Sequence, residues 1–234
     1  MQDRTYSLWE RLVILSLFCD RLDQVSKEYY DEDIPYLITS FNNRIHNGEF
    51  RKPMDNTESQ SEVQLQIMTI LINHRLEGSF VNERFSTSVH TFKMGIGDLG
   101  EIAQETIDLR YKEAYTKYYQ PFMEQHEYIL ENYLVNYVFK NLFPFRPQKS
   151  IFYEQQSVYA EYVLMILHYS LIKTLLIGHA GHHQKDFNIE HVTKLIQTFA
   201  KSIEHNLPFH KQAVQFIETC NMNNTGGMTV LIKN

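Results

Sequence analysis

Residues 151–177 constrain the fold more than any other part of the chain, because they form a long and almost continuous apolar stretch. Three polar side chains, His168, Ser170 and Lys173, interrupt its most apolar window at residues 162–177. A short window that carries such groups suits a bilayer-spanning helix poorly, since polar and charged side chains are expensive in the bilayer core. A helix that is apolar on every side is typical of a protein interior. We therefore expect a buried core helix and no membrane span.

Helical signals dominate the rest of the chain. Ser7 followed by Glu10 forms a capping-box pattern at the start of the first expected helix. Regular strand alternation is absent, with residues 229–232 the one ambiguous segment. Residues 80–94 are only weakly periodic, and the glycine-dense "MGIGDLG" that ends them is predicted to be a turn. The expected helices cover about residues 7–25, 35–48, 59–76, 99–119, 127–142, 151–177, 188–204 and a segment that starts at Pro208.

These signals predict an all-α protein, an irregular multi-helix bundle of about eight or nine helices. Residues 1–234 are long enough for a sizeable core and are interpreted as a single helical domain. A polar link that contains a proline, "NGEFRKPMDNTESQ", is the candidate boundary if the chain divides in two, near residues 48–60. Prolines close other expected helices, one at Pro121 and another just after residue 142.

Charge and cysteine content exclude several classes of function. The chain has 22 basic and 28 acidic residues, a net charge of −6, and they are scattered, so no surface is built to follow a phosphate backbone. Nucleic acid is therefore not an expected partner. The two cysteines, Cys19 and Cys220, are far apart and predict neither a disulfide framework nor a cysteine metal site. Without a signal-peptide pattern at the N-terminus, we expect a cytoplasmic protein.

The segment "EYILENYLVNYVFKNLFPF" carries unusually many polar groups for an apolar helix. Asn132 and Asn136 share a stripe with Val135 and Phe139, and a buried amide without partners costs about 1–3 kcal/mol. These amides should therefore bond to a neighbouring helix, a loop or a ligand. The polar groups either join helices and fix their register or form the wall of a pocket. In the second interpretation the candidate substrate-binding residues are Glu131, Asn132, Tyr133, Asn136 and Tyr137.

Histidines are concentrated after the core helix, in "GHAGHH" and at His191. The spacing of His179, His182 and His183 could place imidazoles around a metal if the segment were helical. Its two glycines favour a loop instead, and the only nearby carboxylates that could complete a site are Asp186 and Glu190, so no metal site is predicted. His168 and Lys173 are expected to be satisfied core residues or to reach toward water.

Glu204 and His205 stand next to each other at the end of an expected helix. Neighbours in sequence point in different directions on a helix, so these two are not a ready-made acid–base pair. We interpret them as part of the helix termination, in which a histidine near the last turn is common.

Three segments resemble one known family. "ILENYLVNYVFKNLFPF" is similar to a characteristic stretch of the flagellin lysine-N-methylases, which are bacterial enzymes, and so are "LWERLVILSLFCDRL" and "LIQTFAKSIEHN". The segments occur in the expected order over nearly the whole chain. The resemblance implies a protein-lysine N-methyltransferase that transfers methyl groups from S-adenosylmethionine to lysine side chains of flagellin.

The chain departs from this family in one respect. The family carries a cysteine-rich motif near its N-terminus, which by resemblance holds a [4Fe–4S] cluster, and four thiolates are needed where this chain has two cysteines. We therefore expect the C-terminal part of such an enzyme, which contributes substrate binding and scaffold and works with the missing cysteine-rich segment. The alternative is a non-catalytic all-α module that binds a ligand or a protein, such as the effector domain of a regulator.

Overall fold

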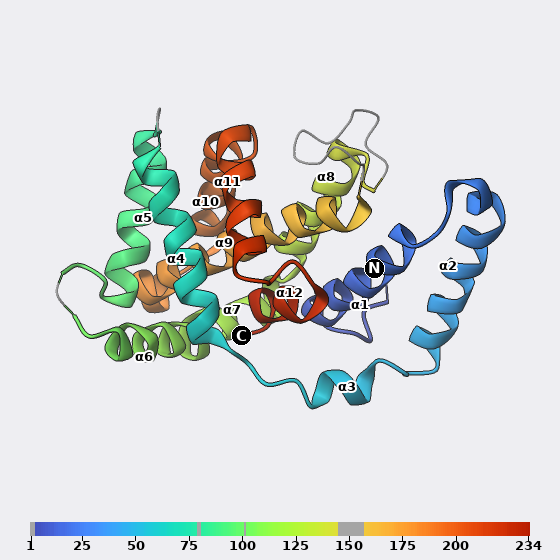
Figure 1. Cartoon of the computed structure of the whole chain (residues 1–234). Helices are drawn as coiled ribbons and strands as arrows, with labels where there is room; N and C mark the ends of the chain where they lie inside the picture. The colour runs from blue at the N-terminus through green and yellow to red at the C-terminus, as the bar shows by residue number, and fades with distance from the viewer. Residues whose placement is uncertain (1–2, 79–80, 101, 145–156) are drawn as a thin grey trace.

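The computed structural model describes residues 3–78, 81–100, 102–144 and 157–234, and this part of the chain contains helices and no strands (Figure 1). About 80% of the chain is helical, which confirms the all-α prediction. The predicted number of helices was too low. Two labelled helices, α6 and α7, join through a π-helical segment, so the described residues form 11 helices rather than eight or nine.

The helix bounds agree with most of the expected segments, with shifts of a few residues at the ends. A π segment spans Tyr115–Tyr119, and short 3₁₀ turns precede α2 and follow α9. The helices are α1 (Leu8–Asp23), α2 (Tyr30–His46), α3 (Arg51–Asp55), α4 (Ser61–Glu77), α5 (Glu83–Ile96), α6 (Gln104–Ala114), α7 (Gln120–His126), α8 (Tyr128–Asn141), α9 (Val158–His183), α10 (Ile189–Ser202), α11 (Leu207–Thr219) and α12 (Thr225–Ile232).

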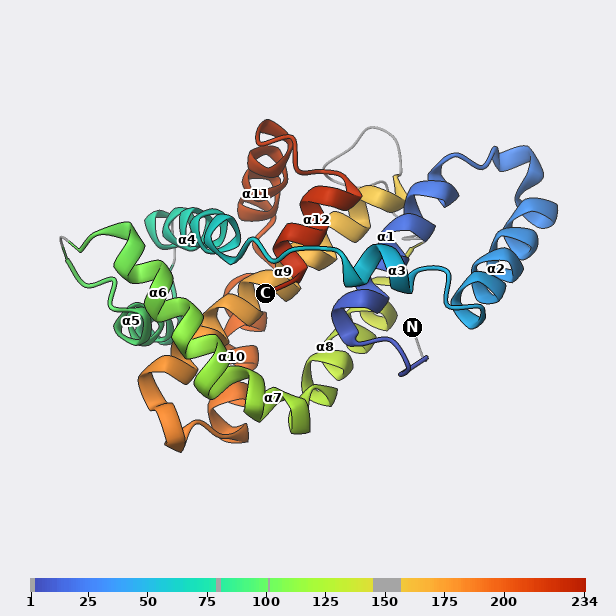
Figure 2. The same ribbon diagram turned by 90° about the horizontal axis from the view of Figure 1, so that it is seen from below.

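Helix α9 is the centre of the fold, as the apolar stretch predicted. It contacts helices from both ends of the chain, including α1, α5, α6, α10 and α12 (Figures 1 and 2). Of its 26 residues, 22 are buried. By length and composition α9 could cross a membrane, but its whole apolar window is covered by other helices of this chain, as in the core helix of a globular fold. Residues 151–156 of the expected helix lie outside the described residues.

The polar groups inside α9 have definite partners at the end of α12. Lys173 Nζ donates to the carbonyl of Ile232 at 2.6 Å, and Ser170 Oγ donates to the carbonyl of Leu231 at 2.9 Å. Gln64 of α4 donates to the same Leu231 carbonyl at 2.6 Å. The last carbonyls of a helix have no partner within it, so these side chains satisfy the C-terminal end of α12. Lys173 is thus a satisfied core residue, and burial lowers its pKa to about 7.

Helices α5 and α9 cross in very close contact at three glycines, Gly95, Gly178 and Gly181. A Cβ added at any of them would run into the facing helix, at Gly178 into both the ring and the backbone of Phe92. This explains why "GHAGHH" is the end of α9 and not the loop that was predicted, because here glycine serves close helix packing. The first three residues of "MGIGDLG" likewise belong to α5, and the predicted turn begins at Gly97, where φ is 76°.

Two prolines lie inside helices that were expected to begin or end there. Pro35 lies within α2, which starts earlier at three acidic residues that favour a helix N-terminus. Pro121 lies just after the π segment, where the hydrogen-bonding register already changes and the loss of one N–H is tolerated. The ambiguous residues 229–232 are helical in α12.

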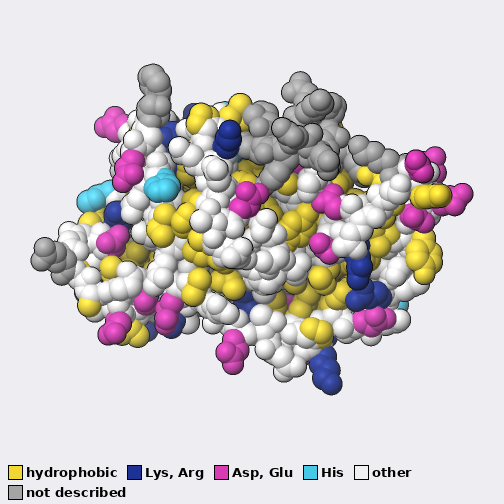
Figure 3. Space-filling model, in the orientation of Figure 1, with side chains coloured by type: hydrophobic (Ala, Val, Ile, Leu, Met, Phe, Trp, Pro, Cys, Tyr) yellow, Lys and Arg dark blue, Asp and Glu magenta, His cyan; other side chains and the backbone are white. Residues whose placement is uncertain are grey.

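Helix α2 forms an arm beside the body (right side of Figures 1 and 2), and α3 lies on the connection from this arm back to α4. The expected polar link therefore contains a short helix, α3. In α2 only Phe41 is buried, and its ring packs on Phe18 of α1 and on Phe50 at centroid distances of 5.3 and 5.9 Å. Acidic and hydrophobic side chains lie together on the surface of this end of the molecule (Figure 3).

Candidate functional site

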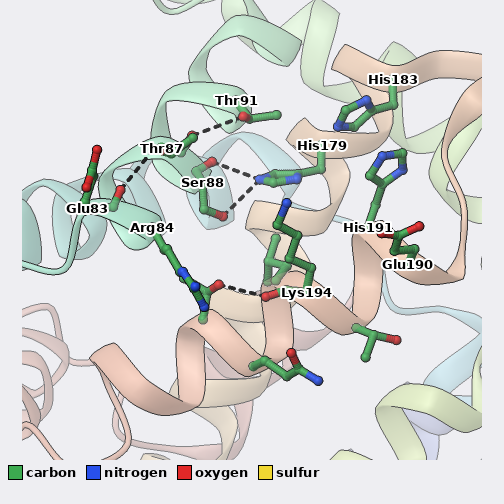
Figure 4. A pocket seen from close by; sticks show the side chains of 14 residues that line it. Glu83, Arg84, Thr87, Ser88, Thr91, His179, His183, Glu190, His191 and Lys194 are labelled. Carbon is green, nitrogen blue, oxygen red and sulfur yellow. Dashed lines mark hydrogen bonds between the residues drawn. The ribbon is translucent and has the colours of Figure 1, made fainter.

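A cleft of about 840 Å³ opens between α5 and α10, with the C-terminal part of α9 beneath it (Figure 4). Threonines face it from both walls, among them Thr87 on α5 and Thr193 on α10. Both hydroxyls donate to the carbonyl four residues earlier in their own helix. The charged residues of the cleft include both signs: Glu83, Arg84, Glu190 and Lys194. A hollow of this size exceeds a single side chain and suits an extended segment or a ligand of similar bulk.

His179 forms the buried floor of the cleft. Its Nε2 lies 2.9 Å from the carbonyl oxygen of Ser88 and 3.0 Å from the Ser88 hydroxyl (Figure 4). A carbonyl oxygen only accepts, so Nε2 carries the hydrogen and Nδ1 keeps its lone pair. Burial lowers the pKa of His179 to about 4, with nearby histidines acting in the same direction. The imidazole is therefore neutral at physiological pH.

Two further histidines stack at one end of the cleft. The rings of His183 and His191 lie 3.8 Å apart between centroids and are tilted by 9°. Burial, and then the neighbouring imidazoles, lower the pKa of His183, which favours the neutral form of this imidazole. Asn188 holds this end in place, because its side chain accepts hydrogen bonds from the backbone N–H groups of Glu190 and His191, as in a helix N-cap.

The structure brings together three of the four histidines that the sequence singled out, and His182 is exposed. Among the described residues, no group of three or more histidine, cysteine, aspartate or glutamate side chains is arranged to hold a metal ion. The cleft is lined by imidazoles and hydroxyls, with ionic groups at exposed positions.

The five candidate residues of α8 do not converge on one site. Glu131 faces α1 and pairs with Arg11 at 3.1 Å and with Arg4 at 3.5 Å. Asn132 and Asn136 are exposed, so the expectation that their amides lie within the protein is wrong. The apolar residues of their stripe, Val135 and Phe139, are themselves 46% and 75% exposed, because this face of the helix points to solvent.

Tyr133 and Tyr137 are the two candidates that lie inside. Tyr133 packs edge-on against Phe199 of α10, and Tyr137 packs edge-on against His168 of α9 at a centroid distance of 5.5 Å. Burial, and then the Glu204 carboxylate, raise the pKa of Tyr133 well above its usual value. We call this buried side of α8, which carries the two tyrosines and not the asparagines, the polar wall, and its part in substrate binding stays a prediction.

The α5 wall of the cleft was missed by the sequence analysis. Its residues lie in the weakly periodic segment, and Ser88 is 91 residues away from the histidine that it contacts. One local signal was present. Asn82 accepts a hydrogen bond from the backbone N–H of Arg84 at 2.9 Å and so caps the start of α5.

The thiols of this chain do not fit an iron–sulfur cluster. Cys19 is buried within α1 and Cys220 is exposed at the end of α11, and both are free. Burial raises the pKa of Cys19, which opposes the thiolate form that a cluster ligand needs. A [4Fe–4S] cluster takes four thiolates, twice the number available.

Comparison with known proteins gave one match. The model of the family described as the FliB lysine N-methylase C-terminal domain matches residues 1–231. No curated protein and no solved structure matches the chain. The matched range includes both walls and the floor of the cleft.

Proposed function

Because the chain belongs to the FliB lysine N-methylase family, as its C-terminal domain, we propose that it is the substrate-binding and scaffold part of an enzyme that methylates flagellin. The cleft between α5 and α10 receives the segment of flagellin that carries the lysine. The observation that carries this proposal is the cleft itself, a hollow of about 840 Å³ on a domain that spans the whole family match.

The lining of the cleft supports a protein segment as the occupant. A peptide presents backbone N–H groups, and the hydroxyl oxygens of Thr87, Thr91 and Thr193, which donate their own hydrogens within their helices, can accept hydrogen bonds from them. Arg84 and Lys194 on one hand, and Glu83 and Glu190 on the other, can pair with charges of either sign on the segment. The neutral His179 beneath adds a floor that binds polar groups without imposing a charge.

The methyl donor belongs, in this proposal, to another part of the enzyme. The [4Fe–4S] cluster would be held by the cysteine-rich segment of the family, because the two thiols here cannot hold it. S-adenosylmethionine would supply the methyl group, and the described residues bind and orient the recipient protein. We place the domain in the cytoplasm, which its free cysteines support.

Blocking the cleft tests this assignment. Thr87→Trp and Thr193→Trp insert a large ring into the cleft from exposed positions, with little effect expected on the core. Thr39→Trp on α2 is the matched control, since Thr39 is also an exposed helical threonine whose hydroxyl donates to the carbonyl four residues earlier. The dissociation constant for purified flagellin is measured for each variant by calorimetry.

We expect the two cleft variants to bind flagellin at least about tenfold more weakly, a loss of roughly 1.4 kcal/mol, and the control to bind normally. Equal affinity in all three variants would remove the cleft from the proposal. A chain that binds no flagellin at all, with or without the cysteine-rich segment, would favour the alternative of a non-catalytic ligand-binding module.

A further inference from the structure

A second hollow of about 300 Å³ lies on the opposite half of α9, beside the polar wall of α8. We call it the α8 hollow. Tyr137 and Lys140 face it from α8, and His168 faces it from α9. Glu204, just after α10, and His210 of α11 complete it. His168 in this hollow and His179 in the cleft are eleven residues apart on α9, which is roughly 16 Å along the helix. The α8 hollow is therefore separate from the cleft.

Glu204 is a carboxylate that has been largely removed from water. Its side chain is 12% exposed, and Oε2 lies 2.7 Å from Nζ of Lys140. The Lys140 side chain is 49% exposed, and its ammonium group lies at the end of a flexible aliphatic chain. The pair is therefore unequal. Glu204 needs a cation because a carboxylate out of water is costly, whereas Lys140 could return to solvent at little expense.

Aromatic rings stand next to this carboxylate. Tyr137 packs edge-on against His168 at 5.5 Å, and the Nε2 atoms of His168 and His210 lie 3.0 Å apart. A contact at that distance holds one hydrogen between the two imidazoles, so at least one Nε2 carries no hydrogen. All three side chains are at least nine-tenths buried. Ring faces attract cations, and a carboxylate beside such rings is the chemistry that recognises ammonium and methylated ammonium groups.

The volume also suits this class of ligand. About 300 Å³ is more than one lysine side chain occupies, so it leaves space for added N-methyl groups. Methylation keeps the positive charge and enlarges and dehydrates the head, and both changes favour a ring-lined site with a counter-charge. A lysine ammonium already occupies the position next to Glu204, and it comes from the chain itself.

We propose that the α8 hollow binds the side-chain ammonium of a lysine, unmethylated or N-methylated, from a protein, with Glu204 as the counter-ion and Tyr137 and His168 as ring walls. Lys140 is the internal occupant that an incoming lysine displaces. The proposal rests on the proposed function only for the identity of the protein that supplies the lysine.

Two small probes test the site without flagellin. Nα-acetyl-lysine amide and its Nε-trimethyl form are titrated into the chain, and chemical-shift changes give the dissociation constants. Glu204→Gln removes the charge and keeps the shape, so binding of both probes should weaken at least about tenfold. Lys140→Met removes the competing ammonium, so binding should tighten about two- to fivefold.

The chain offers a matched control for both substitutions. Lys117 Nζ and Glu113 Oε1 lie 2.6 Å apart, but both side chains are more than half exposed. Lys117→Met and Glu113→Gln should leave probe binding unchanged, and thermal melting checks that every variant is folded. A packing role for Glu204 predicts no gain in Lys140→Met.

The proposal is overturned if neither probe saturates the unmodified chain, or if both bind Glu204→Gln as well as the unmodified chain. These outcomes are independent of the flagellin assay. Loss of flagellin binding in Thr87→Trp together with normal probe binding supports both sites. If the probes bind in a way that depends on Glu204 but the chain does not bind flagellin, the lysine site in the α8 hollow is supported and the proposed function is refuted.

Discussion

Helices α9 and α2 show how differently two helices of one chain can use apolar residues. In α9, 22 of 26 residues are buried, whereas in α2 only Phe41 of 17 residues is buried. Both helices contain isoleucines and tyrosines, and each also contains a residue that is unusual inside a helix of its kind, Pro35 in α2 and Lys173 in α9. The contribution of a residue type to stability therefore depends on which helix carries it. The same substitution should lower the free energy of unfolding more in α9 than in α2.

The arm is fixed mainly through the C-terminal half of α2. Phe41 packs between Phe18 and Phe50, and the Arg44 guanidinium lies 4.5 Å from the centroid of the Phe50 ring. Nearer the start of α2, Tyr36 is 76% exposed. Local opening of that half should cost far less free energy than unfolding α9, because few buried contacts are lost.

The largest effect is expected at the glycine crossing. In Gly178→Val the new side chain meets the ring and backbone of Phe92, so the free energy of unfolding should fall by about 3–5 kcal/mol. Gly100→Val is the control, since no atom lies within 4 Å of a Cβ there. Urea unfolding followed by circular dichroism measures both. A Gly178→Val chain within about 1 kcal/mol of the control would mean that the helices can separate freely.

The next effect compares one residue type in the two helices. Ile172 of α9 is fully buried and Ile38 of α2 is 45% exposed. Ile172→Ala should destabilise the protein by about 3 kcal/mol, because it leaves a cavity, and Ile38→Ala by less than about 1 kcal/mol. The same urea experiment checks the pair. Similar losses at both positions would show that the arm is as tightly packed as the body.

The third prediction concerns pH. The folded protein lowers the pKa of Lys173 from 10.5 to about 7, so between these values the unfolded chain binds a proton that the folded chain does not. Stability from this group therefore rises with pH in that window, by up to about 1.4 kcal/mol per pH unit. Between pH 7 and 9 the unmodified chain should gain roughly 2 kcal/mol relative to Lys173→Met.

Unfolding free energies of both chains at several pH values provide the measurement. Taking the difference between the chains removes the contributions of other titrating groups. Parallel pH profiles would show that Lys173 stays protonated inside the fold, held by the carbonyl end of α12.

The smallest effect is the loss of one hydroxyl. Tyr162 of α9 donates to the carbonyl of Leu12 at 2.9 Å, so Tyr162→Phe should cost about 1 kcal/mol. Tyr36→Phe on the arm should change stability by less than about 0.5 kcal/mol. Thermal melting resolves the two. An equal shift in both would assign the Tyr162 loss to packing rather than to the hydrogen bond.

The all-α class and the central helix could be predicted because they follow from local periodicity and from one uniformly apolar stretch. The capping box at Ser7 and the cap at Asn188 were also local signals, and both are present in the structure. Glycine was the main source of error. Gly178 and Gly181 follow a long apolar helix, where glycines often begin a loop. Their role in helix packing is clear only once α5 is seen to lie against them.

Site residues were harder to predict for a physical reason. Periodicity placed the asparagines of α8 on a stripe but could not say that this stripe faces water, since Val135 and Phe139 made it look apolar. Among the five candidates on α8, only Tyr133 and Tyr137 lie inside the fold, and their role in binding stays a prediction. The cleft joins residues about 90 positions apart, and no spacing along the sequence reports such a contact.

The glycine crossing has a consequence for how this domain can diverge among its relatives. At Gly95, Gly178 and Gly181 the two helices approach so closely that any side chain added there would collide with the facing helix. The α5 side of the cleft is thereby held at a fixed depth above its histidine floor. Adaptation to a different recipient segment is left to α10, whose position depends on ordinary side-chain packing and can shift by small substitutions.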